Sequence, residues 1–182
     1  MKPAMTLAAA AMALLANPLA AQDMSAFTTG PVFEEFGPHA PVESDFAIPK
    51  DMDLFVAFDT ATAAEEGKIN RTIESAARFV NMHNAAGVEP ARVRAAVVVH
   101  GKAAFDLLSQ EAWEAKGKEG ENATAKAFPA LFDNGVRVIL CGQSAAAYGI
   151  TKDDLAPGVE MALSAMTAHA VLQRQGYTVN PF

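Results

Sequence analysis

The chain has a single cysteine, Cys141, among its 182 residues. One thiol cannot form a disulfide within the chain, so no internal cross-link supports the fold. Zinc sites use three or four ligands, mostly Cys and His at short spacings, and one cysteine with four dispersed histidines gives no such set. We therefore predict no metal site. The thiol is either an inert core residue or a reactive centre.

Several other functional signals are missing. No Gly-x-x-x-x-Gly-Lys or Gly-x-Gly-x-x-Gly segment is present, so nucleotide binding is not indicated, and there is no Gly-x-Ser-x-Gly elbow. Basic residues are fewer than acidic ones, 14 against 21, and they form no block. That balance argues against nucleic acid or an anionic membrane surface as a partner. We predict no cofactor and no nucleic-acid partner.

No apolar run reaches the ~20 residues that a membrane-spanning helix needs. The nearly unbroken run from Met5 to Ala16 follows Lys2, is interrupted by Asn17-Pro18, and precedes the small residues of Leu19-Ala20-Ala21. This is the pattern of a secretory signal peptide. We predict that residues 1–21 are removed and that the mature protein is periplasmic and not held in the membrane. An uncleaved N-terminal anchor is the alternative.

Residues 22–50 are rich in proline and glycine, which predicts irregular structure. They also contain four aromatic rings, Phe27, Phe33, Phe36 and Phe46, whereas disordered linkers are poor in aromatic residues. We predict an extended arm that lies on a folded domain formed by residues 51–182. The pattern leaves open whether the arm docks on its own domain or on a neighbouring subunit.

From Asp53 onward, apolar strands alternate with helical segments. Strands are predicted at 54–58, 93–99, 136–140, 159–163 and 177–179, and helices at 68–86, 103–108, from the loop at 116–120 to residue 133, from 142 to 148, and at 167–175. Strands that are apolar on both faces and joined by helices are typical of parallel sheets. The sequence therefore predicts a layered α/β domain with a mainly parallel sheet.

Three polar residues stand where predicted strands end. Asp59 follows the first strand, His100 the second and Cys141 the third. Ligands of open α/β sheets bind outside the carboxyl ends of the strands, and right-handed crossovers put those ends on one edge. Each residue also has a simpler interpretation: a buried thiol, a structural histidine, and an aspartate that caps a loop or helix. His169, in the last predicted helix, is predicted to be a surface or packing residue.

Cys141 stands between a buried strand and a short alanine-rich helix. A thiol near the positive end of a helix dipole and near unpaired N–H groups is favoured as the thiolate. The helix begins with Gly142-Gln143-Ser144, in which Ser144 could act as the N-cap and Gly142 indicates the close approach of another backbone segment. This environment makes Cys141 the leading candidate for a reactive residue.

An ordered set of segments resembles the DsrE/DsrF-like sulfur-relay family: Val97-Val98-Val99-His100-Gly101, Leu140-Cys141-Gly142-Gln143-Ser144, Tyr148-Gly149-Ile150, Pro157-Gly158-Val159 and Gln173-Arg174-Gln175-Gly176-Tyr177. The match runs from about Asp53 to Phe182. It implies a flavodoxin-like three-layer sandwich around a five-stranded sheet, and assembly as a homo-oligomer, a trimer or a hexamer. It also implies that Cys141 carries sulfane sulfur as a persulfide, with a small sulfur anion or a sulfur-transfer protein as partner.

These observations leave three functional hypotheses. In the first, the chain is a periplasmic sulfur carrier or sulfurtransferase: the Cys141 thiolate holds a persulfide, and His100 deprotonates the thiol or binds an anionic donor. Asp59, which could orient the histidine, and Gly142, Gln143 and Ser144 form the substrate-binding group. In the second, the chain is a non-catalytic oligomeric binding or assembly protein with an inert thiol. In the third, it is a redox sensor whose thiol oxidises or pairs between subunits.

Overall fold

The computed structural model describes residues 23–49 and 51–180. The predicted signal peptide lies outside the described residues. Within them, five strands form one sheet in the order β4-β3-β2-β1-β5, and every neighbouring pair is parallel. The strands are β1 (Leu54–Thr60), β2 (Val93–Val99), β3 (Arg137–Cys141), β4 (Glu160–Ala162) and β5 (Thr178–Asn180). The predicted fold class is confirmed, with a sheet that is wholly rather than mainly parallel.

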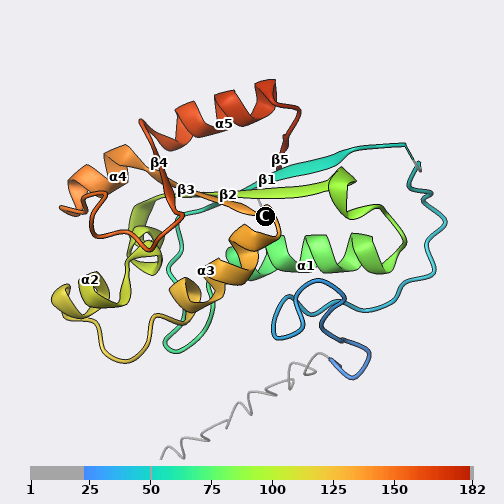
Figure 1. Ribbon diagram of the computed structural model, residues 1–182, viewed down its shortest axis with the longest axis horizontal. Coiled ribbons are helices and arrows are strands. Elements are labelled where there is room, and N and C mark those ends of the chain that lie inside the picture. Colours follow the sequence, from blue (N-terminus) through green and yellow to red (C-terminus); the bar gives the residue numbers. More distant parts are fainter. Residues whose placement is uncertain (1–22, 50, 181–182) are drawn as a thin grey trace, which may run out of the picture.

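Helices cover both faces of the sheet and give the molecule three layers (Figure 1). Helices α1 (Arg71–Ala85) and α3 (Ala123–Asp133) lie on one face, and α5 (Ala165–Arg174) lies on the other. The short helices α2 (Gln110–Ala115) and α4 (Gly142–Ala147) gather near the carboxyl ends of the central strands, as does the 3-10 helix η2 (Gly101–Leu107). A second 3-10 helix, η1 (Pro90–Arg92), precedes β2. No helix among the described residues has both the length and the apolar character needed to cross a membrane.

Polar side chains fix where several helices begin. Asn70 caps α1 by accepting from the backbone N–H groups of Thr72 and Ile73, so the helix begins at Arg71 rather than near residue 68. Ser109, Asn122 and Ser164 cap α2, α3 and α5 in the same manner. Because Asn70 has this role at the first helix, the alternative that Asp59 caps the helix is wrong. Pro129 lies inside α3.

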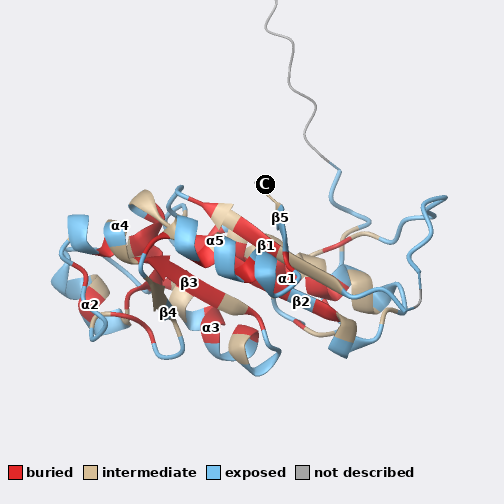
Figure 2. Ribbon diagram, turned by 90° about the horizontal axis from the view of Figure 1, so that it is seen from above, coloured by how far each residue is buried: buried red, intermediate tan, exposed pale blue. Residues whose placement is uncertain are grey.

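The sheet separates two hydrophobic cores of different size. The larger core lies between the sheet and α1 and α3, and it includes Val97, Val99 and Leu140. The smaller core lies beneath α5, where Val98 and Ile139 pack with a few helix residues. Figure 2 shows the buried central strands running beneath α5. Because side chains alternate along a strand, the sequence position of a residue in β2 or β3 decides which core it joins.

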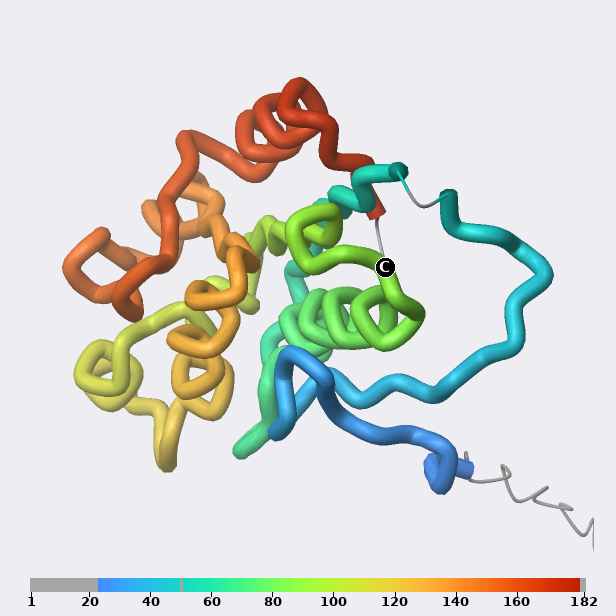
Figure 3. The backbone as a smooth tube through the Cα atoms, turned by 45° about the vertical axis from the view of Figure 1, so that its right-hand side comes forward, coloured from blue at the N-terminus to red at the C-terminus, as the bar shows by residue number. Residues whose placement is uncertain are grey.

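Part of the predicted arm docks on α1 of its own chain. Asn81 on that helix is fully buried. Its Oδ1 accepts from the N–H groups of Val32 and Phe33, and its Nδ2 lies within 3.2 Å of three arm carbonyl oxygens. Gly37 comes so close to the helix that a Cβ atom there would lie 2.7 Å from the backbone nitrogen of Arg78. The next segment, residues 40–49, swings wide of the sheet (Figure 3) and is largely exposed.

Candidate functional site

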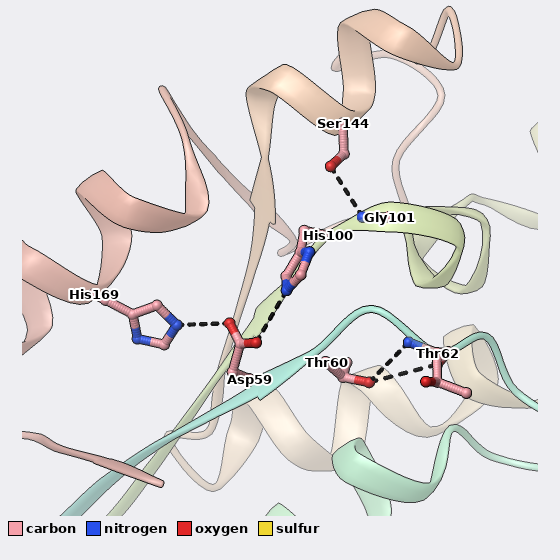
Figure 4. A network of polar contacts seen from close by, with 7 residues as sticks. All are labelled: Asp59, Thr60, Thr62, His100, Gly101, Ser144 and His169. Atoms are coloured by element: carbon pink, nitrogen blue, oxygen red, sulfur yellow. Dashed lines mark hydrogen bonds and ion pairs between the residues drawn. The ribbon is translucent and has the colours of Figure 1, made fainter. Parts of the chain in front are cut away.

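Asp59 and His100 meet at the carboxyl edge of the sheet. Asp59 lies within β1, whereas the sequence pattern placed it just after the strand. It is opposite Val98 of β2 in the register. Residues two apart in a strand share a face, so His100 continues the face of Val98, which α5 covers. His100 Nε2 is 3.0 Å from Asp59 Oδ1 (Figure 4). Two residues that the sequence placed only at strand ends are therefore in direct contact.

A second histidine binds the other oxygen of the same carboxylate. His169 Nε2, on α5, is 2.7 Å from Asp59 Oδ2 (Figure 4). The sequence predicted a surface or packing residue and did not indicate this contact; the His169 side chain is only 19% exposed, so it does not lie free on the surface. One sequence signal could have found it. His169 follows Ala165 by four residues and precedes Leu172 by three, and both of these pack in the core beneath α5.

Asp59 is held as an anion between the two imidazoles. Burial raises the pKa of this carboxyl, but hydrogen bonds from His169 and His100 outweigh the burial and hold the pKa below its ordinary value. An ionised carboxylate can only accept hydrogen bonds, so each histidine presents a protonated Nε2 to it. In its neutral form, His100 then carries a free lone pair on Nδ1. Figure 4 shows this nitrogen on the side of the ring away from Asp59.

Cys141 is the neighbour of His100 across the sheet. Val99 of β2 is opposite Leu140 of β3 in the parallel register. The next residues along these strands are His100 and Cys141, and adjacent strands lie about 4.8 Å apart. Cys141 also shares a face with Ile139, which packs beneath α5. The register therefore places the two residues at the ends of neighbouring strands, on the face of the sheet that α5 covers.

The electrostatic surroundings of Cys141 favour the thiolate. Burial raises the pKa of the thiol, but the N–H groups of Ser144, Ala165 and Gln143 and the Ser144 hydroxyl outweigh it, and the pKa is lowered. The sulfur makes no N-cap hydrogen bond of regular geometry to α4. We therefore attribute the lowering to the combined field of N–H groups from the starts of two helices, α4 and α5. The Cys141 residue is 6% exposed.

Gly142 and Gln143 hold the connection between β4 and α5 against the thiol. A Cβ atom on Gly142 would lie 2.6 Å from the Ala162 carbonyl oxygen and 3.1 Å from that of Leu163. Gln143 Nε2 donates to the same Leu163 oxygen at 3.1 Å. The close backbone approach predicted at Gly142 is thus observed. It brings the first N–H group of α5 to Cys141.

Ser144 links α4 to the turn after β2. Its Oγ accepts from the Gly101 N–H at 3.0 Å (Figure 4). The predicted N-cap role of Ser144 is wrong, because Cys141 itself occupies the N-cap position and Ser144 is the third residue of the helix. Since Gly101 follows His100 directly, this bond ties the backbone beside the histidine to the helix that begins beside the cysteine.

The described residues hold no group of three or more His, Cys, Asp or Glu side chains arranged to bind a metal ion. Two histidines and an aspartate do converge here, but each Nε2 is engaged with a separate oxygen of Asp59. The arrangement is that of a carboxylate clamped by two N–H donors. Imidazole and carboxylate groups in such an arrangement can hold or transfer protons.

Residues 52–181 match the model of the DsrE/DsrF-like family, and the chain belongs to that family. The resemblance found in the sequence is thereby confirmed. No curated protein matches the chain. One similar solved structure is a protein of unknown function, MTH1491 from Methanobacterium thermoautotrophicum, at 21% identity over 72% of this chain and 100% of that chain, with a TM-score of 0.49.

The lowered thiol pKa predicts how Cys141 reacts with an alkylating agent. We expect the rate of iodoacetamide modification to reach half its limiting value at a lower pH than in an unstructured cysteine peptide. Ser144→Ala removes the hydroxyl contribution and should move that midpoint to higher pH. Ser75→Ala serves as the control, because the Ser75 hydroxyl bonds only within α1. A wild-type midpoint at or above that of the peptide would contradict this electrostatic account.

Proposed function

We propose that this protein is a sulfur carrier that holds sulfane sulfur as a persulfide on Cys141. The observation that carries the proposal is the convergence of N–H groups from two helices on the single thiol of the chain, with the pKa of that thiol lowered. The thiolate is the nucleophilic form of cysteine. Membership of the DsrE/DsrF-like family supports a sulfur-relay function of this kind.

The loading step can be written with thiosulfate as the donor. His100 Nδ1 takes the proton of the Cys141 thiol, and the resulting thiolate attacks the sulfane sulfur. The bond between that sulfur and the sulfonate breaks, and sulfite leaves with the electron pair. The product is a persulfide anion on Cys141, whose charge lies near the same N–H groups. No external oxidant is required, because the transferred sulfur already has the oxidation state of sulfane sulfur.

We further propose that the carrier acts in the periplasm as a homo-oligomer, a trimer or a hexamer. Its sulfur would come from a small sulfur anion or a sulfur-transfer protein. Two large apolar residues beside the site, Leu163 and Met166, are 73% and 80% exposed. Leu163 lies in the connection between β4 and α5, and Met166 lies in the first turn of α5. Their exposure supports a protein surface docking there, either another subunit or a transfer partner.

The burial of Cys141 favours a second candidate function. A thiol that is 6% exposed is reached by a donor only if the connection between β4 and α5 opens. If it stays closed, the residue is inert, and the protein is an oligomeric binding or assembly protein of the same fold. The two functions therefore differ in whether Cys141 reacts in the native state.

The mass of the intact protein separates these functions. After incubation with thiosulfate or polysulfide, we expect wild type to gain one sulfur atom that dithiothreitol removes, and Cys141→Ser to gain none. His100→Gln should load more slowly, because it lacks the basic nitrogen. No gain of mass, with no alkylation of the native protein, would reject the carrier. A Cys141-linked dimer on non-reducing gels that reductant reverses would instead support the redox sensor.

A further inference from the structure

His169 has no part in the loading step, yet it binds the same carboxylate as His100. We propose that His169 is a positioning residue that acts through Asp59. By holding Oδ2, it keeps Oδ1 on His100 Nε2, and so fixes His100 in the tautomer that leaves the Nδ1 lone pair free, at the strand end next to that of Cys141. The use of that lone pair in sulfur loading rests on the proposed function. The tautomer of His100 can be measured independently of it.

Two hydrogen bonds hold the Asp59 carboxylate. The terminal torsion angle of an aspartate side chain has a broad distribution, so a single hydrogen bond leaves the carboxylate free to turn. Asp59 has two bonds on opposite oxygens, 3.0 Å to His100 and 2.7 Å to His169. These partners come from the end of β2 and from α5, on two different sides of the carboxylate (Figure 4). Together they fix both its position and its plane.

Packing alone does not explain a histidine on this face of α5. The residues around it on the same face, Ala165, Ala168 and Leu172, are apolar and pack against the sheet. His169 Nδ1 is buried without a hydrogen-bond partner among the described residues. A leucine would fill this space with no unpaired nitrogen. Burial of an unpaired nitrogen costs free energy. The other nitrogen of the same ring, Nε2, binds Asp59, and this contact accounts for a histidine here.

Loss of His169 would leave one oxygen of a partly buried carboxylate without a partner. His169 and His100 are the two residues whose hydrogen bonds lower the pKa of Asp59. With His169 in place, both carboxylate oxygens are bound to N–H donors. Without it, Oδ2 would lack its partner, and Asp59 could turn away from His100.

The test compares two substitutions of His169. His169→Gln keeps an N–H donor at similar reach, and His169→Leu fills the space without a donor. The side-chain nitrogen shifts of His100, measured by NMR on protein with labelled histidine at mildly alkaline pH, report which ring nitrogen carries the proton. We expect a proton on Nε2 in wild type and in His169→Gln, and a mixture of tautomers in His169→Leu. Thermal unfolding of each variant checks the fold, and His169→Phe replaces the leucine variant if it does not fold.

Sulfur loading gives the second readout. We expect His169→Leu to load sulfur roughly two- to tenfold more slowly than wild type, and His169→Gln to load at close to the wild-type rate. The expected loss is smaller than the roughly 10²–10⁴-fold rate enhancement that a general base contributes, because His100 itself remains. An unchanged His100 tautomer in the folded donor-free variant, leucine or its phenylalanine replacement, would overturn the inference. If wild type takes up no sulfur while the tautomer still changes in His169→Leu, the positioning role stands and the carrier function fails. The two proposals can therefore fail separately.

Discussion

Replacing Asn81 with alanine should release the N-terminal arm from α1. The Asn81 side chain satisfies arm N–H and carbonyl groups that are otherwise shielded from water. Each buried polar group left without a partner costs about 1–3 kcal/mol. The total is limited because the arm can detach and hydrate those groups, which sacrifices the burial of Phe33, about 1.5–3 kcal/mol. We therefore expect the free energy of unfolding to fall by about 2–4 kcal/mol.

Limited proteolysis with chymotrypsin measures the release directly. Phe46 is 89% exposed and should be cut in every variant, so it is an internal reference. Phe33 is 2% exposed and should be cut early only after the arm detaches. Asn84→Ala is the matched control, because Asn84 lies on the same helix and its side-chain amide bonds only to the Val80 carbonyl oxygen of that helix. Early cleavage at Phe33 in wild type, or none in Asn81→Ala, would refute the prediction.

Replacing Gly142 with alanine should damage both the stability of the fold and the environment of the thiol. The new methyl group would lie 2.6 Å from the Ala162 carbonyl oxygen, so backbone has to move. Overpacking of this kind costs about 1–3 kcal/mol. The helix propensity gained by replacing glycine is at most about 1 kcal/mol and less at a helix start, so the steric cost wins. Displacing the start of α5 also moves the Ala165 N–H away from Cys141 and should raise the thiol pKa.

Chemical denaturation and the pH profile of Cys141 alkylation measure these two effects in the same protein. Ala147→Gln is the control: it enlarges an exposed side chain of α4 and keeps a good helix former. We expect Gly142→Ala to be less stable and to alkylate with a midpoint at higher pH, and the control to match wild type in both. A Gly142→Ala protein with unchanged stability and an unchanged profile would show that the close approach does not hold the site together.

The fold follows from local patterns in the sequence, which explains why it could be predicted. The apolar segment ending at Val99 reads as a strand buried on both faces, and the structure places it at the centre of the sheet. The observed start of a helix differs from the predicted one where a side chain caps the helix. Asn70, for example, caps α1, which therefore begins later than the apolar pattern indicates. The closeness of Cys141 to a helix start was also readable, because strand and helix are consecutive in the chain.

The rest of the site depends on contacts between distant segments. The bond between Asp59 and His169 joins residues 110 positions apart, and no local pattern pairs them. The Ala165 N–H at Cys141 likewise arrives through the packing of the connection after β4. Asn81 is a further case: in sequence it is a polar residue beside the apolar face of α1, and only the arm's backbone explains it. Its position next to Val80 on that face was the available signal.

The position of α5 in the chain has a consequence for the order in which the protein assembles. This helix follows every other described helix in sequence, yet it supplies the Ala165 N–H at Cys141 and the His169 partner of Asp59. A chain still being synthesised can pair β1, β2 and β3 before α5 exists. Until that helix docks, the thiol lies on an uncovered sheet face without the Ala165 N–H. Docking of the final helix then buries the sulfur and adds this N–H in one event, so an incomplete chain exposes Cys141 without one of the groups that favour the thiolate.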